Sequence, residues 1–300
     1  KLDHEQLVPL RRPDPSLPEL FRGHDHELRH RDGFALTDRR GTDRDHHNEL
    51  DYCMLCHGRD KDSCSKGMRE KTGGRTFALG LSAPGIPDER NTRIRFMPGR
   101  LEGLEGLDWS TMLGHPCSVM NDAIAAMAAE ARFGKARGMR HVAMLTLGTG
   151  VGGALLLDGW IYQGAFQKAG HLGHITVDHA GEPDVTGMPG SLEDAIGNCT
   201  IEQRSKGRFK STHDLLEAYR LGDASARDIW LLSVRKLAIG IASITNVVSP
   251  EMVVIGGGIT EAGEDLFKPL AEFLAKYEWR AGGNGVRVEK AAFGDLAGAM

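Results

Sequence analysis

The chain has 300 residues, of which 37 are basic and 41 acidic, so its formal net charge is −4. This balance leaves no large positive field to hold the phosphates of a nucleic acid, and tight DNA binding is not expected. The chain carries no run of about 18 apolar residues and no opening signal-peptide pattern, so we expect a cytoplasmic protein without a membrane span.

Charge is unevenly distributed along the chain. Of the first 70 residues, 28 are charged, against 50 of the remaining 230. Four prolines interrupt the opening residues, and no stretch there keeps a helical or strand period for long. We therefore expect an extended or weakly ordered, His-rich arm, joined near Lys71 to a different kind of sequence.

The arm contains a cluster of cysteines at Cys53, Cys56 and Cys64, with His57 beside the second. Three thiolates at this spacing suit an iron–sulfur or zinc site, with His57 or another chain as the fourth ligand. Three uncoordinated thiols are the alternative, and both interpretations remain open. The stretch 52–67 also resembles a segment of large iron–sulfur flavoprotein oxidoreductases.

After Lys71, apolar strands that end in glycine turns alternate with helices, which is typical of an α/β protein. Helices are predicted over Asp122–Ala136, Ser225–Val248 and Glu264–Tyr277. Strands are predicted over Thr76–Leu81, Val142–Leu147, Ala154–Leu157, Trp160–Tyr162, Met252–Ile255 and Val286–Ala292. The third and fourth of these strands are expected to form a hairpin about an Asp-Gly turn.

Two glycine clusters follow predicted strands. In the first, Gly148, Thr149 and Gly150 offer close backbone approach and a hydroxyl donor, which suits phosphate. In the second, Gly256, Gly257 and Gly258 allow a flat ligand such as adenine to lie against the chain. A glycine-rich turn is the alternative for each cluster alone, and neither matches the Walker or dinucleotide-binding pattern.

Polar residues of two further segments are candidates for chemistry. Asn121 and Asp122 open a predicted helix, where such residues commonly act as N-caps but where a carboxylate can also accept a proton from a hydroxyl. His171 and His174 lie three residues apart and could bind metal or sugar hydroxyls, or form a surface hydrogen-bonded pair. Spacing alone does not choose between these roles.

Taken together and in order, four segments resemble the ROK (repressor, ORF, kinase) family of sugar kinases and repressors. Residues 79–88 resemble its substrate-loop strand, 119–123 its catalytic motif, 147–174 its signature and 250–258 its adenosine strand and loop. The resemblance runs from about Thr76 to the C-terminus. It implies an α/β, actin-like ATPase (ribonuclease H-like) fold and, since the family is commonly dimeric, a homodimer.

The resemblance also implies an activity, the ATP-dependent phosphorylation of a sugar hydroxyl by a glucokinase-like or fructokinase-like hexose kinase. Asp122 would be the base and Asn121 would bind sugar hydroxyls. The glycine clusters would hold ATP, with phosphate at Gly148, Thr149 and Gly150 and adenosine at Gly256, Gly257 and Gly258. Magnesium would bridge the phosphates.

The chain departs from the family pattern near the sugar-binding turn. His171 stands where the family has a Glu, so sugar preference is expected to differ. The family often holds zinc with the His of this turn and three cysteines, but the corresponding stretch, 184–193, has none. We therefore expect no zinc at His174, while the retained Glu193 is expected to bind a sugar hydroxyl.

The largest departure concerns residues 1–70, which do not supply the family's first strands or its Asp-x-Gly-Gly-Thr phosphate loop. Gene fusion or an erroneous junction would explain this. The expected organisation is a foreign arm over 1–72, a remnant of the N-terminal lobe over 73–118 and the C-terminal ATPase lobe over 119–300. The alternative function is a catalytically impaired, sugar-binding or sugar-sensing protein that lacks the first phosphate loop.

Overall fold

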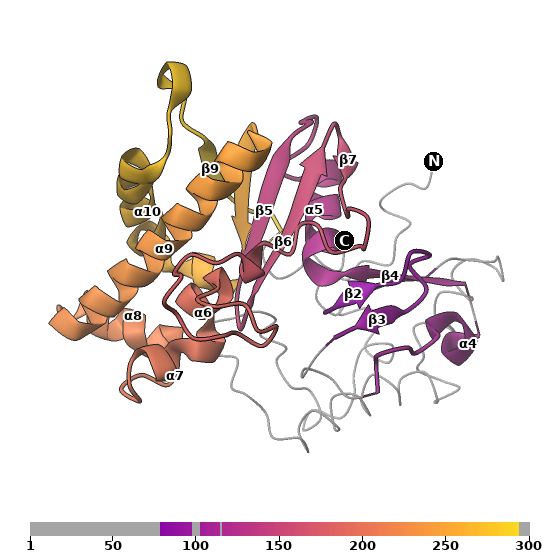
Figure 1. Cartoon of the computed structure of the whole chain (residues 1–300), viewed down its shortest axis with the longest axis horizontal. Helices are drawn as coiled ribbons and strands as arrows, with labels where there is room; N and C mark the ends of the chain where they lie inside the picture. The colour runs from indigo at the N-terminus through magenta and orange to yellow at the C-terminus, as the bar shows by residue number, and fades with distance from the viewer. Residues whose placement is uncertain (1–78, 98–102, 115, 294–300) are drawn as a thin grey trace, which may run out of the picture. The chain divides into compact units, whose positions relative to one another are not determined.

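The computed structural model describes residues 79–97, 103–114 and 116–293 (Figure 1). The chain divides into two compact units, and the described residues of the smaller one are 79–81, 107–114 and 116–118. The larger unit contains the described residues from 82 to 106 and from Val119 onward. The predicted arm, its cysteines Cys53, Cys56 and Cys64, and the expected absence of the first phosphate loop lie outside the described residues.

The smaller unit contains the short helix α4 (Trp109–Leu113), which the Asp108 side chain caps by accepting from the backbone of Thr111. The Ser110 hydroxyl accepts a hydrogen bond from the Cys117 backbone N–H at 2.9 Å. This contact fixes the chain just before it continues as strand β4 (Cys117–Asn121), which pairs with β1 (Leu79–Ala83).

In the larger unit, the main sheet has five strands in the order β7-β6-β5-β8-β9. At its centre, β5 (Val142–Leu147) runs antiparallel to β6 (Val151–Leu157) and parallel to β8 (Met252–Gly256). The edges are β7 (Trp160–Ile161), antiparallel to β6, and β9 (Arg287–Lys290), parallel to β8. A separate antiparallel pair joins β2 (Ile86–Pro87) and β3 (Ile94–Phe96).

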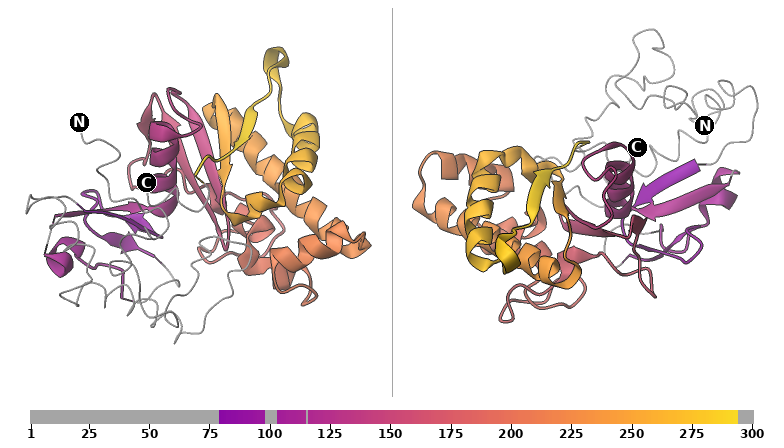
Figure 2. Two further views of the ribbon diagram at one scale, coloured as in Figure 1. Left: turned by 180° about the vertical axis from the view of Figure 1, so that it is seen from behind. Right: turned by 90° about the horizontal axis from the view of Figure 1, so that it is seen from above.

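Helices cover both faces of this sheet (Figures 1 and 2). Alternate β5 side chains point to opposite faces, so Val142 and Met144 pack with α5 (Asp122–Phe133) in one cluster. Ala143, Leu145 and Leu147 belong to the other cluster, together with side chains of α9 (Ala224–Val248) and α10 (Glu264–Tyr277). This is why the central strands β5 and β8 are apolar at nearly every position, with Thr146 the exception.

The larger unit also contains shorter helices. They are α6 (Leu192–Ile196), α7 (Ile201–Arg204) and α8 (Thr212–Arg220), with 3₁₀ turns η2 (Leu172–His174), η3 (Asn198–Thr200), η4 (Gly258–Ala262) and η5 (Ala281–Gly283). In the described part of the chain, α9 is the one helix long and apolar enough to cross a membrane. Its side chains Trp230, Leu237 and Ile241 are buried in the core cluster, so its apolar character is that of a core helix.

The element predictions for the larger unit are confirmed with shifted ends. The helix predicted from Asp122 ends at Phe133 rather than Ala136, because Gly134 follows and its N–H bonds back to the Glu130 carbonyl oxygen. Strand β6 begins at Val151, three residues before the predicted start. Gly152 and Gly153, which follow the first glycine cluster, are therefore strand residues and not part of a loop.

Candidate active site

The first glycine cluster forms a tight turn between β5 and β6. The Gly148 N–H donates to the Gly150 carbonyl oxygen at 2.9 Å and closes the turn. The turn is held from outside, since Asn198 N–H donates to the Gly148 carbonyl at 2.9 Å and Cys199 N–H to that of Thr149 at 2.8 Å. Backbone groups of η3 therefore fix the position of the predicted phosphate loop.

The glycines at the start of β6 permit close packing. A Cβ on Gly152 would lie 2.4 Å from the Thr146 hydroxyl oxygen and 2.9 Å from the Ala123 Cβ. A Cβ on Gly153 would lie 2.6 Å from the Gly170 carbonyl oxygen. The missing side chains thus let β6 lie directly against both the start of α5 and the turn that precedes η2.

The structure brings the second glycine cluster next to the first. Gly257 has φ +86, and a Cβ there would lie 2.4 Å from the carbonyl oxygen of Leu147, the residue before Gly148. Because β5 and β8 are parallel, both clusters lie at the carboxyl ends of adjacent strands, where open α/β sheets commonly bind ligands. Gly256, Gly257 and Gly258 are themselves buried.

Asn121 is the N-cap of α5. Its side-chain oxygen accepts from the backbone N–H groups of Ala123 at 3.0 Å and Ile124 at 3.3 Å. Its amide nitrogen donates to the Gly85 carbonyl oxygen at 2.9 Å. An amide oxygen accepts two hydrogen bonds and an NH₂ group donates two, so one N–H of Asn121 is left to offer to a ligand.

Asp122 is the first residue of α5 and follows directly on β4. One of its carboxylate oxygens accepts from the Ala123 backbone N–H at 2.8 Å. The positive end of the helix dipole favours a negative side chain at this place. Since Ala123 packs against Gly152, the carboxylate is attached to the helix turn that touches β6.

His171 and Glu193 approach the same end of β6. A Cβ on Gly173 would lie 1.8 Å from the Val151 carbonyl oxygen, so η2 packs on the first residue of β6. Glu193, buried on α6, accepts a hydrogen bond from the Val151 N–H at 2.9 Å. The turn η2, which follows His171 and contains His174, and the Glu193 side chain thus contact the same residue at the start of β6.

His171 carries an uncompensated polar atom, since its Nε2 is buried and has no hydrogen-bond partner. Burial, together with the neighbouring His174 ring and the nearby Lys168 ammonium, lowers the pKa of His171. The imidazole is therefore neutral near pH 7. A buried, unpaired nitrogen costs free energy unless something bonds to it, which is typical of a position that meets a ligand.

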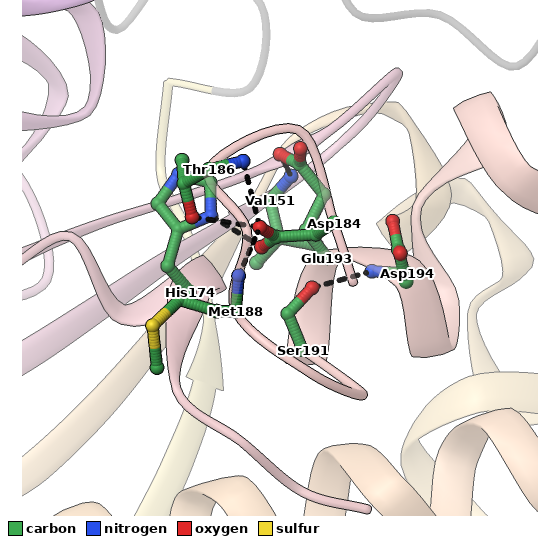
Figure 3. Close-up of polar contacts among 8 residues, drawn as sticks. All are labelled: Val151, His174, Asp184, Thr186, Met188, Ser191, Glu193 and Asp194. Carbon is green, nitrogen blue, oxygen red and sulfur yellow. Dashed lines mark hydrogen bonds and ion pairs between the residues drawn. The ribbon is translucent and has the colours of Figure 1, made fainter. Parts of the chain in front are cut away.

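A cluster of hydrogen bonds centred on Asp184 adjoins these residues (Figure 3). One Asp184 oxygen lies 2.8 Å from His174 Nδ1. The other accepts from the backbone N–H and hydroxyl of Thr186, at 2.8 and 2.7 Å, and from the Met188 N–H at 3.1 Å. The carboxylate therefore joins the His174 ring to the loop that follows it.

Sequence patterns did not identify the residues that support the turn 197–200. The Arg204 side chain donates to the Gly197 carbonyl oxygen at 2.8 Å, to the Thr200 hydroxyl at 3.1 Å and to the Ser233 hydroxyl on α9 at 2.5 Å. Burial lowers the pKa of Arg204 to about 10, which leaves it charged at neutral pH. This buried cation links α9 to the backbone that holds the first glycine loop.

The described residues contain no group of three or more His, Cys, Asp or Glu side chains that could hold a metal ion. Magnesium in phosphoryl transfer needs no such group, because it is bound through one or two carboxylates together with substrate phosphates. Cys117 and Cys199, the cysteines within the described ranges, form no disulfide bond.

Comparison with known proteins agrees with the resemblance deduced from the motifs. The model of the ROK family matches residues 64–300. A glucokinase from Thermotoga maritima is 32% identical over 225 residues, which cover 66% of this chain and 69% of the relative. This chain thus spans about two thirds of that protein's length.

Two solved structures share the fold. A ROK hexokinase from Thermus thermophilus has a TM-score of 0.69 and 30% identity, with 78% of this chain and 79% of that one covered. A ROK glucokinase from Streptomyces griseus, solved with glucose and AMPPNP, has a TM-score of 0.65 and 26% identity, covering 78% and 83%. The fold is the actin-like ATPase fold, as predicted. The chain belongs to the ROK family.

Proposed function

We propose that this protein is an ATP-dependent sugar kinase in which Asp122 accepts the proton of the attacking sugar hydroxyl. The observation that carries the proposal is the arrangement at the carboxyl ends of strands β5 and β8. Asp122 opens the helix whose next residue packs on Gly152, while both glycine loops end the adjacent strands β5 and β8. The ROK glucokinase and hexokinase relatives support the same activity.

The base has one task in this reaction. A carboxylate within hydrogen-bond reach of a hydroxyl takes its proton as the oxygen attacks the terminal phosphoryl group. The hydrogen bond from the Ala123 N–H holds one carboxylate oxygen of Asp122 in place. The same rotamer sets the position of the second oxygen. The remaining catalysis comes from positioning and from neutralising phosphate charge.

The sugar would lie against Asn121, His171, His174 and Glu193. Asn121 contributes its remaining N–H, and the buried Nε2 of His171 gains a partner when a sugar hydroxyl reaches it. A neutral imidazole offers a hydroxyl group one hydrogen-bond donor and one acceptor, whereas a carboxylate offers acceptors only. The neutral His171 therefore favours an uncharged hexose.

The nucleotide would lie across the two glycine loops. Gly148, Thr149 and Gly150 would hold phosphates through backbone N–H groups, and Gly256, Gly257 and Gly258 would lie along the adenosine. Magnesium bound to the phosphates would neutralise the charge that develops on their oxygens. Homodimer formation and a cytoplasmic location stay predictions.

A coupled assay of ADP formation over a panel of neutral hexoses tests this proposal. We expect ADP release that depends on one or more sugars. ADP formation that no sugar stimulates would exclude the kinase.

The alternative, a sugar-binding protein that does not turn over, has one observation in its favour, the replacement of the family's Glu by His171. It predicts that a sugar raises the melting temperature without stimulating ADP release. Measuring both quantities on the same preparation separates the two functions.

A further inference from the structure

The turn from His174 to Ser191 contains the positions at which the family resemblance would place zinc ligands, namely His174, Asp184, Thr186 and Ser191. These residues do not fit zinc, since thiolates are replaced by one carboxylate and two hydroxyls. Their polar atoms are also engaged. Ser191 caps α6 by accepting from the Asp194 N–H at 3.2 Å, and Thr186 donates to Asp184.

We propose that this turn is metal-free, that the buried Asp184 carboxylate holds it together in place of a metal ion, and that Asp184 is a positioning residue which fixes the His174 ring with its hydrogen on Nδ1. The proposal rests on four hydrogen bonds to one carboxylate (Figure 3). They close the loop from both sides, since the donors precede and follow Asp184 in the sequence.

The direction of the bond to His174 follows from the state of the acid. The Asp184 side chain is 0% exposed, and its burial opposes ionisation. The oxygen that does not contact His174 accepts three hydrogen bonds, from the Thr186 N–H and hydroxyl and from the Met188 N–H, and these donors stabilise the ionised form. An ionised carboxylate has no hydrogen to donate, so the hydrogen in the 2.8 Å contact belongs to His174 Nδ1.

The neighbouring acids do not compete for this role. Glu193 bonds to the Val151 N–H. Burial, with Asp184 and Glu193 nearby, raises the pKa of Asp194, while Arg204 acts in the opposite direction. Asp184 is the carboxylate at hydrogen-bond distance from the His174 ring.

The orientation has a consequence that rests on the proposed function. With the hydrogen on Nδ1 bonded to Asp184, the uncharged form of the His174 ring has a lone pair on Nε2, and a sugar hydroxyl can donate to it. A carboxylate thus sets which hydrogen-bonding role the second histidine of the turn has toward the substrate.

Two measurements on the sugar-free full chain test the proposal independently of kinase activity. Metal analysis should find far less than one zinc per chain, and a chelator should not lower the melting temperature. Long-range ¹H–¹⁵N NMR of the imidazoles near neutral pH, with His174 assigned by its absence in His174→Gln, should show hydrogen on Nδ1. One bound zinc whose removal destabilises the chain, or a His174 ring with hydrogen on Nε2 and none on Nδ1, would overturn it.

Substitutions test whether Asp184 is what keeps the hydrogen on His174 Nδ1. Asp184→Asn should lower the melting temperature by on the order of 10 °C and release His174 into a mixture of tautomers. The matched control is Asp178→Asn, which removes a carboxylate that bonds to Lys236 at 2.8 Å and should leave the His174 tautomer unchanged. An unchanged tautomer in Asp184→Asn, or an equal change in the control, contradicts the positioning role.

If Asp184→Asn does not fold, Thr186→Val supplies the second comparison. It removes one hydroxyl donor and keeps the carboxylate, so the melting temperature should fall while Nδ1 keeps its hydrogen. A tautomer change in Thr186→Val would show that the loop conformation, rather than the carboxylate, orients the ring. Failure of the kinase assay would leave all of these expectations unaffected.

Discussion

At the scale of single residues, His171 carries the largest chemical difference from the family's sugar-binding turn. Its burial and the nearby Lys168 ammonium lower the pKa of the imidazole and keep it neutral, and its Nε2 has no partner in the described part of the protein. A neutral ring gives no charge to pair with the ammonium of an amino sugar, whereas a Glu at this place would. The residue therefore affects which sugars the site accepts.

We predict that His171→Glu raises the preference for glucosamine over glucose, measured as the ratio of their kcat/KM values, about tenfold, since a charge-assisted hydrogen bond contributes about 1.5 kcal/mol. The matched control is His179→Glu, which adds the same charge at an exposed position. An equal rise in the control would assign the effect to net charge, and an unchanged ratio in His171→Glu would contradict the account.

At the scale of elements, the contact of Gly257 with the end of β5 joins the two glycine loops. Gly257→Ala combines a positive φ with a Cβ at 2.4 Å from a backbone oxygen. We expect it to lower the free energy of unfolding by about 3 kcal/mol, because the backbone must shift. Gly263 also has a positive φ, with ψ −128, but open space around it, so Gly263→Ala should cost only the backbone strain, about 1–2 kcal/mol. Equal losses in chemical denaturation would contradict the packing argument.

Arg204 gives a second prediction at this scale. Arg204→Ala removes donors to Gly197, Thr200 and Ser233, and it should cost about 3 kcal/mol because buried acceptors lose their partners. The KM for ATP should rise as well, since the turn at 197–199 holds the Gly148 loop. Arg227, exposed on α9, supplies the control substitution Arg227→Ala, which should change neither stability nor KM. An unchanged KM for ATP in Arg204→Ala would contradict the proposed link between Arg204 and the Gly148 loop.

The sequence predicts the main-sheet strands and the long helices of the larger unit because their signals are local. Strand β8 is a continuous apolar run, β5 is apolar except at Thr146, and α10 was predicted with its observed ends, Glu264 and Tyr277. The short helices α6, α7 and α8 were not predicted. Boundaries shift where glycine has a packing role. The sequence offers no local signal that distinguishes Gly152, pressed against α5, from a loop glycine.

The supporting contacts of the site could not be predicted in the same way. Arg204 and Ser233 are 29 residues apart, and their contact depends on how α7 packs on α9. Asp184 was recognised only as a poor zinc ligand. Its bond to His174 depends on the geometry of the intervening turn, which no periodicity records. Ser191 did carry a local signal, since Ser followed by Asp three residues later is a typical N-cap pattern.

At the scale of the whole molecule, the family membership and the fold agree with the motifs of the sequence. The family model begins at residue 64, slightly before the resemblance deduced from Thr76 onward. The division into an arm over 1–72, a lobe remnant over 73–118 and an ATPase lobe from 119 stays a prediction, as does a metal site at Cys53, Cys56 and Cys64. The central claim is that the protein transfers a phosphoryl group to a sugar at the site that contains Asp122.

The most direct test is the sugar-dependent rate of ADP formation by Asp122→Asn compared with that of the unsubstituted protein. If Asp122 is the base, kcat should fall by about 10²- to 10⁴-fold, while the sugar still raises the melting temperature as in the unchanged protein. Asp158→Asn is the control, because Asp158 has a positive φ that Asn tolerates and lies in the exposed turn before β7. A kcat that Asp122→Asn leaves unchanged would contradict the account.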